Sequence, residues 1–70
     1  MKSIKSPMAG TVWKVMKEVG DVVDYGDTIL VLESMKMEIP VEADSSGTIQ
    51  KILVAEGEVV DDGVPLVELK

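Results

Sequence analysis

The sequence predicts an all-β fold, a flattened barrel or sandwich composed of two quasi-symmetric halves. Three observations support this prediction. The chain repeats itself after 37 positions without a gap, as Gly10 and Gly47 illustrate. Its apolar segments are short, rich in Val, Ile, Leu and Thr, and bounded by Gly, Asp or Pro, as strands usually are. No segment keeps the 3.6-residue apolar period of a helix over three turns.

The repeat relates residues 10–33 to residues 47–70 and respects the spacing of the glycines. Two matching sets of short strands are too small to bury their faces separately. We therefore expect the halves to pack together with approximate two-fold symmetry. The aligned glycines are Gly10 with Gly47, Gly20 with Gly57, and Gly26 with Gly63.

Five segments are expected to be strands, and glycine-containing segments between them are expected to be turns. Glycine suits such turns because it reaches positive φ without a steric cost. In chain order, the expected strands are Gly10–Met16, Thr28–Glu33, Glu38–Ala43, Gly47–Val54 and Pro65–Leu69. The expected turns are centred on Gly20, Gly26, Gly57 and Gly63.

The repeat also indicates which side chains are buried. Glu68 aligns with Val31, so this position is expected to face solvent in both halves. Strand alternation then buries the residues on either side. The side chains assigned to the core in this way are Leu30, Leu32, Val67 and Leu69, and the most economical assignment of Met8 and Met16 is also to the core.

Each half begins with a strand whose two apolar residues are three positions apart. Simple alternation cannot bury both members of such a pair, so a β-bulge is predicted between them. The pairs are Val12 with Val15 and Ile49 with Ile52, and the bulges are predicted near Trp13-Lys14 and Gln50-Lys51.

Composition limits the chemistry. The chain has 70 residues, enough for one domain, which we expect to span residues 1–70. It has no cysteine for a disulfide or a thiolate metal site and no histidine for a Ser–His or Cys–His nucleophile. A Ser–Lys pair or a carboxylate dyad remains open, but so small a domain has little room for the deep pocket that would shift their pKa values. We expect no metal site, no catalytic residues and no enzymatic activity of the chain alone.

Charge limits the partners. The formal net charge is −6, which disfavours nucleic acid and anionic membranes. Trp13 and Tyr25 are too few aromatics for a base-stacking platform. No apolar run follows the first lysines as in a signal peptide, and the longest branched apolar run, Ile29–Leu32, is too short to span a membrane. These features predict a cytoplasmic protein that binds neither nucleic acid nor membrane.

The junction of the two halves is the candidate functional site. Two expected strands flank the segment Glu33–Glu38 closely, so its four central residues are expected to form an exposed hairpin turn. Hairpin turns usually carry Gly, Asn, Asp or Pro, whereas here Lys36 stands between Met35 and Met37. Two exposed methionines indicate a surface that a partner reads. The alternative is that both methionines point inward and fill gaps in the core.

Other polar residues have simpler interpretations. Ser6 and Ser34 have no accompanying base and are interpreted as strand or turn hydroxyls. The spacing of Asp21, Asp24 and Asp27 is similar to that of a calcium-binding loop, but the glutamate that ends such a loop is missing. Turn formation and solubility explain these aspartates better.

The segment Glu33-Ser34-Met35-Lys36-Met37 resembles the Glu-Ala-Met-Lys-Met signature of biotinyl carrier domains. Upstream, Ser6–Val12 resembles the Pro-Met-Pro-Gly segment of that family, and downstream Ala43–Ile49 resembles its Ala-Asp-x-x-Gly stretch. The similarity extends over the whole chain. Ser34 stands where alanine is usual, and Ala9 where proline is usual.

This resemblance implies a barrel-sandwich hybrid fold with Lys36 on a tight hairpin. It implies that a biotin protein ligase joins biotin to the Lys36 amine and recognises Glu33, Ser34, Met35 and Met37. A biotin carboxylase would then carboxylate the biotin, and a carboxyltransferase would move the carboxyl group to its acceptor. The chain looks like a free-standing carrier without a thumb insertion, a non-catalytic subunit of a carboxylase.

Two alternatives remain. Lipoyl carriers share the fold but usually have Asp-Lys-Ala at the attachment site, so lipoate on Lys36 is the alternative cofactor. The second alternative is an unmodified protein-interaction module that uses the same barrel.

Overall fold

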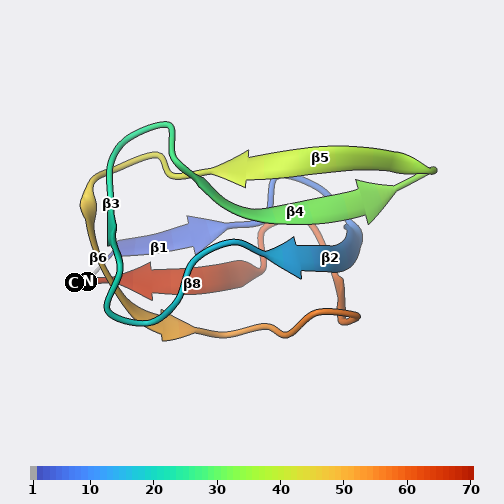
Figure 1. The fold of residues 1–70 in the computed structure, drawn as a ribbon. Coiled ribbons are helices and arrows are strands. Elements are labelled where there is room, and N and C mark those ends of the chain that lie inside the picture. Colours follow the sequence, from blue (N-terminus) through green and yellow to red (C-terminus); the bar gives the residue numbers. More distant parts are fainter. Residues whose placement is uncertain (1) are drawn as a thin grey trace.

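The structure of the chain is a computed structural model that describes residues 2–70. Within this range the backbone forms eight strands and no helix (Figure 1). The strands are β1 (Lys2–Lys5), β2 (Gly10–Val15), β3 (Val22–Val23), β4 (Thr28–Ser34), β5 (Met37–Glu42), β6 (Gly47–Ile52), β7 (Val59–Val60) and β8 (Pro65–Leu69).

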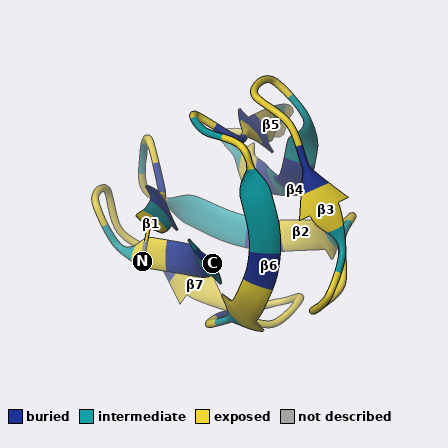
Figure 2. Ribbon diagram, turned by 90° about the vertical axis from the view of Figure 1, so that its left-hand side faces the viewer, coloured by how far each residue is buried: buried dark blue, intermediate teal, exposed yellow. Residues whose placement is uncertain are grey.

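The strands form two four-stranded antiparallel sheets, with the orders β1-β8-β6-β3 and β5-β4-β2-β7. The molecule measures 31 × 18 × 18 Å, and the strands β1, β2, β4, β5 and β8 run along the long axis (Figure 1). Seen from one end, the sheets curl around a common interior (Figure 2). This arrangement confirms the predicted all-β fold, a flattened barrel of two curled sheets.

The sequence repeat relates the two sheets strand by strand. A shift of 37 residues carries β2, β3 and β4 onto β6, β7 and β8. The same shift relates β1 to β5, since it carries Lys2 onto Ile39. Lys2 pairs with Leu69, and Ile39 pairs with Leu32, the residue that the shift carries onto Leu69. The correspondence therefore extends beyond the ranges 10–33 and 47–70. Each sheet takes its short edge strand, β3 or β7, from the other half, so the halves interlock.

Three strands were not predicted from the sequence. β1 is polar apart from Ile4, and β3 and β7 contain two residues each, too few to show alternation. The signal for β1 was nevertheless present, since its residues lie 37 positions before those of β5. The five predicted strands are confirmed, with ends that differ by one or two residues.

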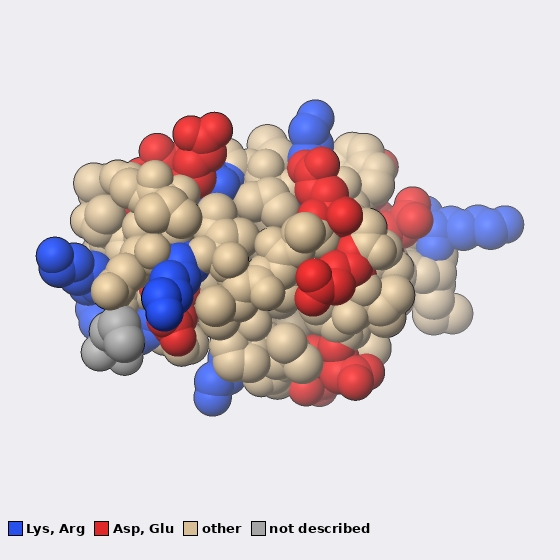
Figure 3. Space-filling model, turned by 90° about the horizontal axis from the view of Figure 1, so that it is seen from below, with Lys and Arg blue, Asp and Glu red and all other residues tan. Residues whose placement is uncertain are grey.

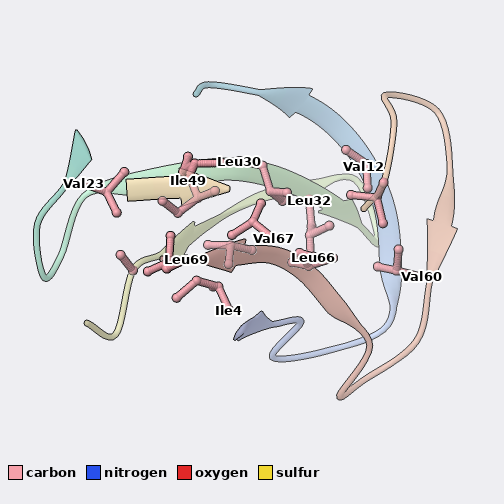
Figure 4. Packing of buried hydrophobic residues seen from close by; sticks show 14 residues of the cluster. Ile4, Val12, Val23, Leu30, Leu32, Ile49, Val60, Leu66, Val67 and Leu69 are labelled. Carbon is pink, nitrogen blue, oxygen red and sulfur yellow. The ribbon is translucent and has the colours of Figure 1, made fainter. Parts of the chain in front are cut away.

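Fourteen buried apolar side chains from both sheets meet in one core (Figure 4). Leu30, Leu32, Val67 and Leu69 are fully buried, as predicted. The prediction missed Ile29 and Leu66, which are buried beside them. Register shifts between Thr28 and Leu30, and between Ile4 and Lys5 opposite β8, interrupt simple alternation there.

The predicted core role of the two methionines is half right. Met8 is partly buried and packs against the core cluster. Met16 is 52% exposed, so its assignment to the core was wrong. The reason is that β2 ends at Val15, which packs against the cluster in its place.

Both predicted β-bulges are present. The register of β2 against β4 shifts between Val12 and Lys14, and that of β6 against β8 shifts between Ile49 and Lys51. The extra residue lets Val12 and Val15 both face the core from one strand.

The aspartates after the first bulge act in turns, as the sequence indicated. A carboxylate oxygen of Asp21 accepts a hydrogen bond from the Glu18 amide at 2.8 Å, and Asp27 accepts one from the Asp24 amide at 2.8 Å. Such bonds hold turns by satisfying backbone donors. Gly20 and Gly26 have φ of 97° and 90° in these two turns, a backbone conformation that residues other than glycine adopt only at an energetic cost.

Candidate functional site

The β4–β5 hairpin projects from one end of the barrel, opposite the end where the N- and C-termini lie (Figure 1). Ser34 pairs with Met37, so Met35 and Lys36 alone form the turn. The core residues Leu30 and Leu32 anchor the strand that leads to it. Lys36 is therefore presented at the apex of a rigid support.

The backbone of this turn is unusual. Met35 has φ of 52° and Lys36 has φ of 65°, so both central residues are left-handed, as in a type I′ turn. Among the described residues, the other left-handed positions are all glycines: Gly20, Gly26, Gly57 and Gly63. A left-handed conformation costs a residue with a Cβ about 1–2 kcal/mol. Backbone strain of this kind concentrates at functional sites.

Both methionines beside the lysine face outward. Met35 is 92% exposed and Met37 is 64% exposed. The alternative that they fill gaps in the core is therefore wrong. Lys36 is exposed as well, so the hairpin tip displays a primary amine between two flexible apolar side chains.

The base of the hairpin is acidic. Glu33 pairs directly with Glu38, and both side chains are exposed. Like charges directly opposite each other on a sheet destabilise it. Glu33 was predicted from the sequence to be a recognition residue, and Glu38 was not. Because the turn consists of only Met35 and Lys36, Glu33 must pair with Glu38. Ser34 is half-buried on the opposite face of the strand, and no side-chain hydrogen bond of Ser34 is found within residues 2–70.

Charge is unevenly distributed over the molecule. In the view from below, several acidic patches lie over the half that carries the hairpin, and basic side chains gather towards the other end (Figure 3). One long basic side chain extends beyond the acidic patches at the hairpin end (Figure 3). The tip thus presents a cation and apolar groups against an acidic background.

A glycine supports the base of the hairpin. A Cβ added at Gly10 would lie 3.0 Å from the Glu33 carbonyl oxygen, so β2 approaches β4 more closely than a side chain allows. Gly47 occupies the equivalent position in the other half, where its Cβ would lie 3.0 Å from the Lys70 carbonyl oxygen.

We predict that Gly10→Ala will destabilise the domain by about 1–3 kcal/mol and slow enzymatic modification of the tip, because β4 must shift at Glu33. Gly47→Ala is the matched control, since it meets a similar obstruction at the end remote from the tip. Thermal unfolding measures the first effect, and the modification rate of the folded variants measures the second. Equal modification rates for the two variants would contradict this role of Gly10.

The described residues contain no pocket and no group of three side chains suited to a metal ion. No helix within residues 2–70 is long and apolar enough to cross a membrane. Ser6 is buried, and its hydroxyl donates to the Met8 carbonyl oxygen, which confirms its structural interpretation. The chemically distinctive feature of the described surface is therefore the hairpin tip.

Comparison with known proteins identifies the family of the chain. A family model described as "Biotin-requiring enzyme" matches residues 2–69. The chain belongs to this biotin-requiring enzyme family. Its fold and sequence are those of a biotin carboxyl carrier-like domain, and the carrier role is supported over the lipoyl alternative by the carboxylase relatives.

Two curated relatives illustrate the range of the family. The "Biotin/lipoyl attachment protein" of Bacillus subtilis (strain 168) is 43% identical over 67 residues, which cover 96% of this chain and 92% of that protein. The "Methylcrotonoyl-CoA carboxylase subunit alpha, mitochondrial" of Arabidopsis thaliana is 52% identical over 68 residues, 97% of this chain but only 9% of that protein. Family members thus occur both as small proteins and within much longer chains.

A solved structure confirms the fold. The urea carboxylase of Kluyveromyces lactis matches with a TM-score of 0.92 and 35% identity, over 99% of this chain and 6% of that chain. Membership of the biotin-requiring enzyme family therefore accounts for the curled two-sheet architecture.

A second prediction follows from the left-handed conformation of the Met35–Lys36 turn. We expect Met35→Asn to stabilise the domain by about 0.5–1 kcal/mol, because asparagine tolerates positive φ better than methionine. If a ligase recognises Met35, as the resemblance implies, the same change should also lower the rate of tip modification, because it removes an exposed apolar group. Urea unfolding and a modification assay measure the two effects. A variant that is less stable than the parent would show that the turn is not strained at Met35.

Proposed function

We propose that this chain carries biotin, covalently attached to Lys36, on behalf of a biotin-dependent carboxylase. The observation that supports this most directly is the exposed lysine at the apex of a two-residue left-handed turn, flanked by exposed Met35 and Met37. The chain itself acts as a non-catalytic carrier in the cytoplasm, and its partners supply the catalysis.

The residues at the tip fit a covalently attached cofactor. The Lys36 side chain is exposed, and no hydrogen bond of its ammonium group is found within the part of the chain described. Attachment therefore breaks no contact that the fold needs. A biotin arm on Lys36 would extend away from the barrel, into space that an enzyme pocket can occupy.

Attachment requires an external catalyst. A primary amine is nucleophilic only in its unprotonated form. Lys36 Nζ must lose a proton, attack the activated carboxyl carbon that a biotin protein ligase provides, and lose a second proton as the amide forms. The leaving group departs with its electron pair. The formal net charge changes from −6 by one unit, to about −7.

The residues around the lysine serve recognition in this proposal. Met35 and Met37 offer flexible apolar contacts, Glu33 offers a charge, and Ser34 fixes the base of the turn beside Met37. Biotin attached there would carry a carboxyl group from a biotin carboxylase to a carboxyltransferase. The barrel would hold the tip in place, and a cofactor tethered to Lys36 would reach each partner site at a raised effective concentration.

The proposed partners agree with the names of relatives. One such relative is the "Methylmalonyl-CoA carboxyltransferase 1.3S subunit" of Propionibacterium freudenreichii subsp. shermanii. It is 57% identical over 35 residues, which cover 50% of this chain and 28% of that protein. Since this chain spans only a small part of several relatives, the partner enzymes and the carboxylated substrate belong to the proposal.

Site mapping tests the proposal. The unmodified chain is incubated with a purified biotin protein ligase, biotin and ATP, then digested and analysed by tandem mass spectrometry. The proposal predicts one biotinylated lysine, Lys36, among the seven lysines of the chain. Biotin on another lysine, or on several, would contradict it. A parallel reaction with a lipoate ligase and lipoate tests the alternative cofactor at the same site.

A further inference from the structure

The repeat provides an internal comparison for exposed positions, because the two sheets share a fold but differ in surface. On the sheet that carries the hairpin, Trp13 and Val31 are apolar. The equivalent positions of the other sheet, 37 residues further along, hold Gln50 and Glu68. Both bulges and both strand pairings are nevertheless the same. The fold therefore does not require apolar side chains at these two positions.

These apolar residues form a row on one outer surface. The bulge sets Trp13 and Lys14 together opposite Val31, and Val31 pairs with Pro40 on the edge strand β5. Neighbours in register point to the same side of a sheet. Trp13 is 47% exposed, Pro40 is exposed and Val31 is half-buried. We call the surface formed by Trp13, Val31 and Pro40 the hairpin face.

The hairpin face is continuous with the tip. Val31 and Ser34 lie three residues apart on β4, about 10 Å at ~3.3 Å per residue. The pair Glu33 and Glu38 lies between them on the same outer side of the sheet. An enzyme large enough to enclose Lys36 and approach from this side covers the hairpin face as well.

We propose that the hairpin face is the docking surface for the protein ligase that modifies Lys36, and that it binds a ligase surface with an apolar centre and a rim of Lys and Arg. This inference rests on the proposed function and adds the means by which one lysine is selected. It assigns Trp13 and Val31 a role that the tip sequence alone does not supply.

A ligase depends on such a surface more than later partners do. The chain contains seven lysines, and all except Lys17 are exposed. The ligase must distinguish Lys36 from the others by protein surface alone, because no cofactor is yet attached. A carboxylase that acts afterwards can bind the attached cofactor itself.

Charge identifies the complementary partner. Glu33 and Glu38 border the hairpin face towards the tip, the exposed Lys14 lies beside Trp13, and the net charge of the chain is −6. A second copy of this chain would bring the same acids to the same border, and like charges there oppose association. A ligase surface with basic residues around an apolar centre is complementary to both features.

The test gives the hairpin face the residues that the other sheet already carries. The double variant Trp13→Gln with Val31→Glu is compared with the parent chain in biotinylation by a purified biotin protein ligase. We expect KM for the carrier to rise about tenfold, since loss of a buried Trp contact weakens docking. We expect kcat to change less than about twofold, because Lys36 and its turn are unaltered.

Two controls separate docking from folding and from charge. Gln50→Glu adds the same single negative charge to the other sheet and should leave KM unchanged. Circular dichroism and thermal unfolding establish that each variant is folded, and Trp13→Gln alone serves if the double variant is not.

Four results would overturn the inference. An unchanged KM in the double variant would show that the ligase does not use this face. An equal rise in KM for Gln50→Glu would show a general charge effect. Normal ligase kinetics with impaired carboxylation by a biotin carboxylase would assign the face to that enzyme. Dimers of the parent chain that the double variant abolishes, with normal ligase kinetics, would assign it to a second copy. No biotinylation of the parent would instead refute the proposed function itself.

Discussion

Lys36→Arg is expected to abolish biotinylation completely while leaving the fold intact. Arginine keeps the positive charge at the tip, but its guanidinium group does not form the amide. The Lys36 side chain is exposed at the end of the hairpin, so the substitution disturbs no packing. Incubation with ligase, biotin and ATP, followed by intact-mass measurement, should show no gain. Thermal unfolding should give a Tm close to that of the parent.

Lys51→Arg is the matched control for this prediction. Lys51 is also an exposed lysine on a strand of the barrel, and it should be dispensable for modification. If Lys36→Arg is still biotinylated to the parent level, the attachment site has been assigned to the wrong lysine. If partner binding and biological function survive in Lys36→Arg, the chain is an interaction module.

Leu32→Ala is expected to cause the largest loss of stability among simple core substitutions near the site. Leu32 is fully buried on β4, three residues before the two-residue turn that begins at Met35. Truncating a buried leucine typically costs about 2–5 kcal/mol. A domain of this length has a total stability of about 4–10 kcal/mol at ~0.05–0.15 kcal/mol per residue. The variant should therefore be partly unfolded at physiological temperature.

Leu69→Ala provides a symmetric comparison, because Leu69 is the repeat equivalent of Leu32 and is equally buried. The two variants should lose similar free energies of unfolding in urea titrations. Modification of the folded fraction should be slower in Leu32→Ala, since Leu32 lies on β4, which leads into the hairpin, whereas Leu69 lies on β8. A loss below about 1 kcal/mol for either variant would contradict the packed two-sheet core described for these residues.

Much of the fold could be read from the sequence because the repeat supplied a second copy of each signal. The three-residue spacing of Val12 and Val15 predicted a bulge. The same spacing of Ile49 and Ile52 supported this prediction with a second strand. The alignment of Val31 with Glu68 gave the correct buried face. These features depend on local alternation, which sequence reveals.

Features that depend on contacts between distant strands were not predicted. β1 was missed because it is polar apart from Ile4, although its residues lie 37 positions before those of β5. β3 and β7 contain only two residues each and join the sheet of the opposite half. Met16 was assigned to the core as the simplest interpretation of a methionine without other context, whereas β2 ends at Val15 and Met16 is exposed. The left-handed φ of Met35 and Lys36 also escaped prediction, because neither residue type favours that conformation.

The symmetry of the fold has a consequence for the position of the tip. The hairpin joins β4 to β5 at one end of the barrel, while the equivalent strands β8 and β1 hold the chain termini at the other (Figure 1). A longer chain joined to either terminus would therefore leave from the end remote from Lys36. This geometry suits a domain that occurs both as a small protein and within large carboxylases.

The intact mass of the chain, purified from cells that contain both biotin and lipoate ligases, tests the central claim most directly. A gain of about 226 Da is predicted, the mass of biotin joined through an amide. A gain of about 188 Da would mean lipoate instead and would move the function from carboxyl transfer to acyl or electron transfer. No gain, with both ligases active on a control carrier in the same cells, would contradict the carrier function altogether.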